Sequence, residues 1–178
     1  VVDILSGDRN PSGRLPASFP HVTGQVPVHY SQHATGRPQT PPESRYLDAP
    51  AGALYPFGFG LSYSTVTCEN LRIEETAPGA RTIRASAQNA GERDIDAVIQ
   101  LYVRDLVGSR ARPVRELKRF QKVSIAAGAS AEISWQIGKD DLAFSRADGT
   151  WGAEPGEFRV WVGTHSRDGV EGMMTLEA

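Results

Sequence analysis

The chain of 178 residues has little sulfur, no long apolar run and no excess of either charge. Its single cysteine, Cys68, cannot form an internal disulfide and excludes the paired cysteines of zinc fingers and redox motifs. Mean hydropathy is −0.35 and no long uninterrupted apolar stretch occurs, so we expect no transmembrane helix and no membrane partner. Lys+Arg number 19 against 21 Asp+Glu, for a formal net charge of −2, which argues against a nucleic-acid partner.

What the chain does have is enough apolar residue to fold. Hydrophobic residues make up 39% and charged residues 22%, which supports a buried core and excludes global disorder. The first residue is valine, and no basic and then apolar signal region follows it. Residues 1–5 are mostly apolar and lead into Gly7, as in the last turn of a helix with a glycine stop. We therefore expect the C-terminal piece of a longer protein.

Residues 1–62 carry most of the prolines. Proline fixes φ and removes a backbone donor, so no long regular element fits there. We expect one short strand at 25–30 and a long loop at 31–56. A structureless loop of that length is typical of a functional segment or of one whose packing partner is missing.

Residues 63–178 alternate between apolar and polar side chains. This period of two is typical of strands with one inward and one outward face. The clearest runs are 82–88, 96–104, 131–137 and 157–162. Less regular runs lie at 66–73, with a bulge expected near Glu69 and Asn70, and at 115–125 and 170–176. About seven short strands with no helix between them predict an antiparallel β-sandwich.

The inward face of this sandwich should contain one set of large apolar residues, while one tryptophan points the other way. Trp161 is out of phase with its neighbours on the same run, so it is either half-exposed or buried under a loop. The residues expected to meet in the core are Ile99, Leu101, Ile133, Trp135, Phe158 and Val160.

Ordered motifs run through both parts of the chain. The first set is GDRNPSGRLPASFP (7–20), GQVPVHY (24–30), TGRP (35–38), SRYLD (44–48) and LYPFGFGLSYS (54–64). The second set is NAGERDIDAVIQLYVRD (89–105), RPVRELKRFQKV (112–123) and EPGEFRVWVG (154–163). The first set resembles the C-terminal region of family 3 glycoside hydrolases, the β-glucosidase/β-xylosidase group. The second set resembles the fibronectin type III-like domain of that family.

The resemblance implies the organisation of the chain. Residues 1–62 would be the irregular tail of an α/β sandwich domain with a linker arm. Residues 63–178 would be a fibronectin type III-like domain, an immunoglobulin-like antiparallel β-sandwich. The chain is then mainly β, and the upstream catalytic domains of the same parent protein are its expected partners.

The resemblance also implies what the parent does. It would be a retaining, exo-acting β-glycosidase that removes terminal β-linked glucose or xylose from an oligosaccharide or glycoside. Retention needs two carboxylates about 5–5.5 Å apart and no cofactor. Both family carboxylates would precede Val1, so we assign no catalytic residue to this chain and expect it to be inactive alone. By resemblance only, the parent would be periplasmic or secreted.

The chain's own titratable residues offer no better site. Asp3, Asp8, Glu43 and Asp48 lie in the proline-rich part without a setting that would separate two carboxyl pKa values, as acid/base chemistry requires. The four histidines lack the close spacing of metal ligands, so we expect no metal site.

Two side-chain clusters allow a functional or a structural interpretation. The basic run from Arg104 to Arg119 could bind phosphate or an acidic polymer. We expect it to be an exposed face whose charge is offset by nearby acids, namely Asp94, Asp96, Asp105 and Glu116. The aromatics around YPFGFG could contact sugar, but we expect them to hold the linker against neighbouring domains.

The arm at 31–56 has no periodicity and cannot form a core of its own. We expect it to pack against the catalytic body of the parent, where Arg37 or Arg45 could pair with carboxylates beside the active-site mouth. Arg37, Arg45 and Tyr46 are therefore the candidate substrate-binding residues.

A second function stays open at this point. The chain could be a free-standing fibronectin-like module that binds carbohydrate or protein, because sandwiches host many binding functions. Residues 1–62 favour the first hypothesis, since a free module has no need of a proline-rich arm that begins inside a helix.

Overall fold

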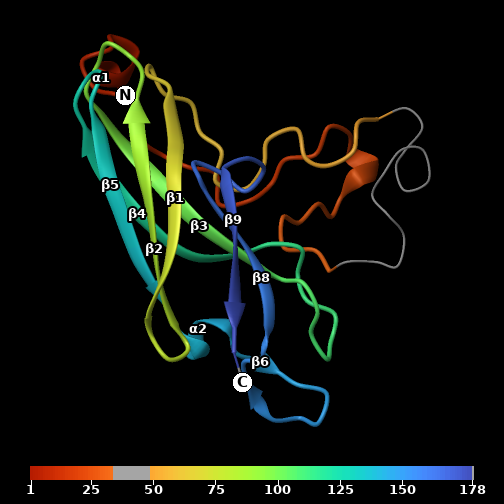
Figure 1. Cartoon of the computed structure of the whole chain (residues 1–178). Helices are drawn as coiled ribbons and strands as arrows, with labels where there is room; N and C mark the ends of the chain where they lie inside the picture. The colour runs from red at the N-terminus through yellow and green to blue at the C-terminus, as the bar shows by residue number, and fades with distance from the viewer. Residues whose placement is uncertain (34–48, 178) are drawn as a thin grey trace.

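Two antiparallel sheets form the body of the molecule in this computed structural model, which describes residues 1–33 and 49–177 (Figure 1). The first sheet has three strands in the order β1-β2-β5, and the second has four in the order β4-β3-β8-β9. This confirms the predicted mainly-β sandwich. The strand bounds are β1 (Val66–Ala77), β2 (Ala80–Asn89), β3 (Ile95–Asp105), β4 (Glu116–Ile125), β5 (Ser130–Ile137), β8 (Gly156–Gly163) and β9 (Val170–Leu176).

The remaining elements are short. The helix α1 lies at one end of the sandwich, while α2 and the small hairpin of β6 and β7 lie at the other (Figure 1). The one-turn helix α2 corrects the expectation that no helix interrupts the strands. These elements are α1 (Val2–Leu5), the 3-10 helix η1 (Thr23–Gln25), α2 (Lys139–Leu142), β6 (Phe144–Ser145) and β7 (Trp151–Gly152).

The expected helix end is confirmed and the expected strand at 25–30 is wrong. Gly7 follows α1 with φ 83°, the left-handed conformation that glycine adopts without strain. The side chain of Gln25 closes a turn by accepting a hydrogen bond from the backbone N–H of His21 at 2.6 Å. Pro27 lacks a backbone donor, and no described residue of 26–30 belongs to a strand.

Apolar residues of the two sheets meet in a single core. Ile99, Leu101, Ile133 and Val160 are fully buried, Phe158 is 2% exposed and Trp135 is 8% exposed, as the alternation predicted. Strand β1 carries the expected bulge, because its register against β2 shifts between Glu69 and Arg72.

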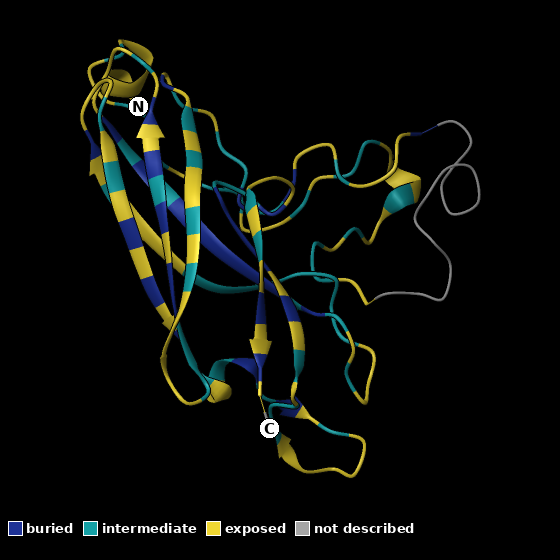
Figure 2. Cartoon of the chain, viewed as in Figure 1, coloured by how far each residue is buried: buried dark blue, intermediate teal, exposed yellow. Residues whose placement is uncertain are grey.

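Strand β3 is buried on both of its faces, which the alternation did not predict (Figure 2). Its outward side chains Gln100 and Tyr102 are 3% and 0% exposed. Residues of the N-terminal part cover them. The ring of Tyr30 lies edge-on to Tyr102 at 5.9 Å, and Gln100 donates a hydrogen bond to the carbonyl oxygen of Gly58 at 3.3 Å.

Trp161 lies beside Tyr102 on this outer face and is 6% exposed, so the second alternative, burial, is correct. The guanidinium of Arg115 stacks on its ring at 3.9 Å, and its indole N–H donates to Glu171 at 3.0 Å. A cation on one face and an acceptor at the edge satisfy a tryptophan that points away from the core.

Candidate functional site

The N-terminal segment is held against residues 54–60 by backbone hydrogen bonds. The Leu15 N–H donates to Phe59 and the Gly58 N–H donates to Leu15, each at 2.8 Å. Phe19 and Tyr55 form an isolated antiparallel bridge further along. Because proline interrupts both segments, pairing stops after these few bonds, and the surface between them is not filled by a regular sheet.

Side-chain hydrogen bonds fix this layer to the sandwich. The Asn10 side chain accepts hydrogen bonds from the Ser62 hydroxyl at 3.1 Å and from the Tyr63 N–H at 2.9 Å. Arg93, from the loop before β3, donates to the carbonyl oxygen of Gly7 at 2.6 Å. The N-terminal part is thus held at one end of the sandwich by Arg93 and along the outer face of β3 by Gln100 and Tyr102.

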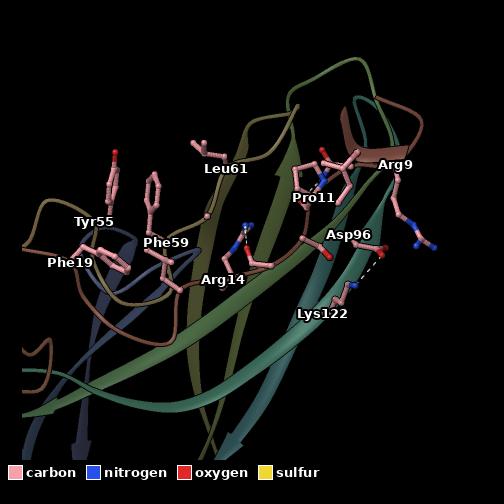
Figure 3. A pocket seen from close by; sticks show the side chains of 15 residues that line it. Arg9, Pro11, Arg14, Phe19, Tyr55, Phe59, Leu61, Asp96 and Lys122 are labelled. Atoms are coloured by element: carbon pink, nitrogen blue, oxygen red, sulfur yellow. Dashed lines mark hydrogen bonds and ion pairs between the residues drawn. The ribbon is translucent and has the colours of Figure 1, made fainter. Parts of the chain in front are cut away.

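A hollow of about 1020 Å³ opens on the outside of this layer (Figure 3). Its wall is largely apolar, and β3 and β4 contribute only Asp96 and Lys122 at one edge. The apolar side chains that line it are Ile4, Pro11, Leu15, Phe19, Tyr55, Phe59 and Leu61.

Aromatic rings stand along the wall of the hollow. Tyr55 and Phe59 are stacked with ring centroids 5.1 Å apart, and Phe19 meets Tyr55 edge-on at 6.4 Å (Figure 3). Phe19 is 49% and Tyr55 is 43% exposed. Contiguous exposed apolar surface of this kind marks an interaction site.

Exposed large apolar side chains concentrate in the N-terminal part. Among the described residues, only Val107, Phe120, Trp151 and Met173 in this class lie after residue 63. The others are Val1, Val2, Ile4, Leu5, Phe19, Val22, Val26, Leu54, Tyr55, Leu61 and Tyr63. The sandwich therefore has only scattered exposed apolar side chains, as most soluble domains do. Residues 1–63 expose many of them, which is typical of an interface.

Arg14 in the hollow forms no ion pair with a carboxylate of the described residues. The Nε of Arg14 is buried and has no hydrogen-bond partner among the described residues, and Nη1 donates only to the neighbouring Gly13 carbonyl at 3.2 Å. Burial lowers the pKa of Arg14, because desolvation disfavours the charged form. A half-buried guanidinium in an apolar wall suits a carboxylate supplied by whatever fills the hollow.

At the other end of the hollow the charges are already paired. Asp96 accepts a hydrogen bond from the Ser124 hydroxyl at 2.6 Å and pairs with Lys122 at 3.3 Å. The hydrogen bond from Ser124 and the interaction with Lys122 lower the pKa of Asp96. This exposed pair keeps Asp96 ionised, so it has no character of a general acid.

The predicted candidate residues Arg37, Arg45 and Tyr46 lie outside the described residues. The two described ends of the arm at 31–56 make hydrogen bonds to the sandwich, while its expected packing against the catalytic body stays a prediction. The Val114 N–H donates to the Gln32 carbonyl at 2.8 Å, and Arg167 donates to the carbonyl of Ala53.

The described residues contain no pair of carboxylates arranged for acid/base catalysis and no cluster of metal ligands. Asp8 accepts a hydrogen bond from the Ser6 hydroxyl at 2.6 Å, and Asp3 sits in the first turn of α1. No group of three His, Cys, Asp or Glu side chains able to hold a metal is found in residues 1–33 and 49–177. In the same residues, no helix is long and apolar enough to span a membrane.

The YPFGFG aromatics divide between two roles. Phe57 stacks on Tyr30 at 4.3 Å and packs inward, as expected of a linker residue. Tyr55 and Phe59 instead line the hollow. The sequence reasoning missed Arg14 and Phe19, whose signal was the apolar spacing within RLPASF.

Family models match both parts of the chain and define its class. Residues 1–63 match the glycosyl hydrolase family 3 C-terminal domain, and residues 97–166 match the fibronectin type III-like domain. The sandwich is therefore of the fibronectin type III-like class, and residues 1–63 match the glycosyl hydrolase family 3 C-terminal domain.

Relatives that align with nearly the whole of this chain support the same family. The chain is 40% identical to the periplasmic beta-glucosidase of Salmonella typhimurium, over 99% of this chain and 24% of that protein. It is 33% identical to the xylan 1,4-beta-xylosidase of Xylanibacter ruminicola, over 94% of this chain and 19% of that protein. The crystal structure of a Listeria innocua beta-glucosidase superimposes with a TM-score of 0.88 at 39% identity, covering 97% of this chain and 25% of that one.

The chain spans about a quarter of the length of these relatives. It belongs to the C-terminal region of the family 3 glycoside hydrolases, including their fibronectin type III-like domain. This confirms the resemblance seen in its motifs.

Proposed function

We propose that this chain is the non-catalytic brace of a retaining, exo-acting β-glycosidase. Its parent would hydrolyse terminal β-linked glucose or xylose, as the names of the relatives suggest. The observation that carries the proposal is the apolar hollow on residues 1–63, whose exposed rings and unpaired Arg14 lack a covering partner in the described residues. The occupant would be the catalytic body of the same parent.

The proposed domain boundary lies between residues 62 and 63. We place the tail of the α/β sandwich domain and the linker arm at 1–62, and the fibronectin type III-like domain at 63–178. The family 3 match that ends at residue 63 supports this division. The tail would present the hollow outward, while the sandwich would hold the tail rigid from behind.

Catalysis would come from elsewhere in the parent. Two carboxylates are sufficient for retaining hydrolysis, so the parent would need no cofactor. The substrate would be an oligosaccharide or glycoside, and we propose no nucleic-acid or membrane partner. A periplasmic or secreted location is proposed from the periplasmic relative.

The direct test is reassembly of the parent from two pieces. The 178-residue chain is mixed with the separately expressed catalytic region encoded upstream of it, and complex formation is measured by size-exclusion chromatography. Leu61→Asp puts a charge into the hollow at a side chain that is 75% exposed, so it should abolish association without unfolding the chain. Val107→Asp, at a side chain that is 80% exposed but outside the hollow, is the matched control.

Two results would contradict the proposal. One is equal association of the Leu61→Asp and Val107→Asp variants. The other is steady hydrolysis of aryl β-glucosides or β-xylosides by the repurified chain alone, which should show no turnover.

A second function is favoured by one exposed ring. Trp151 is 74% exposed on the small hairpin of β6 and β7 and does not line the hollow. An exposed tryptophan can stack on a sugar ring, as a free-standing carbohydrate-binding module would require. Binding of oligosaccharide to the isolated chain, lost in Trp151→Ala, would favour that alternative.

A further inference from the structure

Arginines oppose one another on the outer face of the four-stranded sheet. Arg104 on β3 is the direct cross-strand partner of Arg159 on β8. Like charges directly opposite each other destabilise a sheet, so such a pair needs compensation. In the part of the chain that the structure describes, no ion pair joins either arginine to a carboxylate.

The other sheet shows how the chain handles the same problem. Arg72 and Arg84 are also direct cross-strand partners there. Arg84, however, pairs with Glu132 at 3.3 Å and with Glu74 at 3.8 Å. Glutamates compensate one arginine pair, whereas no carboxylate among the described residues pairs with the other, and Arg159 instead lies 5.9 Å from the centroid of the Trp161 ring.

Two of the acids expected to offset the basic run do so at Arg112 and Lys118, but not at Arg104. Glu116 pairs with Arg112 and with Lys118, both at 2.7 Å, and Asp105 lies 3.9 Å from Arg112. Arg104 receives none of this compensation. The charge of the run is therefore offset at Arg112 and Lys118, while no ion pair reaches Arg104 in the described residues.

Two further guanidinium groups are fixed beside this pair. Arg115 lies 3.9 Å above the Trp161 ring and donates to the carbonyl oxygen of Arg167 at 2.9 Å. Arg167 in turn donates to the carbonyls of Ala53 and Leu54 in the arm. Both cations are thus pre-positioned by backbone acceptors rather than by carboxylates.

The charge around Arg115 is only partly balanced. Burial lowers its pKa and the charge of Arg104 acts in the same direction, while Asp168 and Glu171 act in the opposite direction. Glu171 already accepts the indole hydrogen bond of Trp161. Neither acid lines the space between the arginines.

These side chains surround one hollow of about 550 Å³. Arg104, Arg115, Arg159 and Arg167 all line it, and its described lining contains no Asp or Glu. That volume is in the usual range for a small-molecule site. Planar guanidinium groups present paired donors that match the oxygens of a carboxylate or phosphate.

We propose that this hollow binds a small oxyanion, a carboxylate or phosphate group, through Arg104 and Arg159, with Arg115 and Arg167 as fixed walls. The anion neutralises the uncompensated arginine pair. The site is built jointly by residues 53–54 and the sandwich, because Ala53 and Leu54 supply the carbonyls that hold Arg167. It is separate from the apolar hollow and does not depend on the proposed bracing function.

The test titrates the 178-residue chain by calorimetry at low salt with sodium glucuronate, inorganic phosphate and glucose. We expect one or both anions to bind and glucose not to bind. The glucuronate and phosphate arms distinguish a sugar acid from a phosphate source. Arg104→Gln and Arg159→Gln should each weaken binding about tenfold or more, since a charged hydrogen bond is lost. Arg72→Gln, from the compensated pair, should leave the affinity unchanged.

Thermal unfolding gives an independent readout. Without anion, Arg104→Gln should raise the melting temperature by removing repulsion, and with anion it should lose the stabilisation that the wild-type chain gains. Absence of anion binding, equal binding by the arginine variants and Arg72→Gln, or equal binding of glucose would overturn the proposal.

Discussion

The two faces of the β4-β3-β8-β9 sheet are both buried, but by different means. The inner face packs apolar side chains against the other sheet. The outer face buries Gln100, Tyr102 and Trp161, and each of these makes a hydrogen bond. The inner face is stabilised by dehydration of apolar area, which needs no particular geometry, whereas the outer face depends on each polar group finding its partner.

The two faces of the sheet therefore contribute differently to function. Every β-sandwich requires an apolar inner face, and the residues on it need no specific hydrogen-bond partner. The outer face holds the N-terminal part in place, and thereby positions both the apolar hollow and the arginine-lined hollow. Loss of outer-face contacts should change binding at these surfaces before it unfolds the sandwich.

The largest effect is expected on the inner face. Trp135→Ala removes a ring that is 8% exposed and should lower the free energy of unfolding by about 3–5 kcal/mol, because a cavity remains. Urea denaturation measures it. The exposed Trp151→Ala is the control and should change stability by no more than about 0.5 kcal/mol. Similar losses in both variants would mean that the inner face is assigned to the wrong side of β5.

A smaller effect is expected on the outer face. The Tyr102 hydroxyl donates to Oε1 of the buried Gln100. Tyr102→Phe keeps the ring but leaves that oxygen without its donor, which should cost about 1–3 kcal/mol. Tyr63→Phe, at a ring that is 49% exposed, should cost about 0.5 kcal/mol or less. A neutral Tyr102→Phe would show that apolar burial alone holds this face together.

The smallest effect is a dependence on alkaline pH. Burial raises the pKa of Tyr102 well above its usual value, and Tyr30 acts in the same direction. The folded state therefore keeps the proton while the unfolded chain loses it, so this contribution is complete below about pH 10 and declines above it. From pH 9 to pH 11 the wild-type chain should lose about 1 kcal/mol that Tyr102→Phe does not lose.

Urea denaturation at the two pH values provides the measurement for this third prediction. Trp151→Ala, which removes an exposed side chain without a titratable group, should decline with pH as the wild type does. If Tyr102→Phe declines as steeply as the wild type, Tyr102 is accessible to water and the outer face is open.

Sequence alone was sufficient wherever local pattern decides the structure. The period of two located the sandwich strands and the core residues from Ile99 to Val160, and the break in phase located the bulge at Asn70. The glycine stop after α1 followed from the same kind of local rule. The motifs identified the family, because their order along the chain needs no three-dimensional information.

Tertiary structure decided what covers each face. Alternation states that Tyr102 and Trp161 point away from the core, but it cannot state that Tyr30 and Arg115 will bury them. The strand expected at 25–30 failed for a related reason, since a strand needs a neighbour and no described strand pairs with it. Both hollows arise from side chains that are distant along the chain. The local sequence fixes the direction of each side chain, whereas its environment depends on which segments fold back over it.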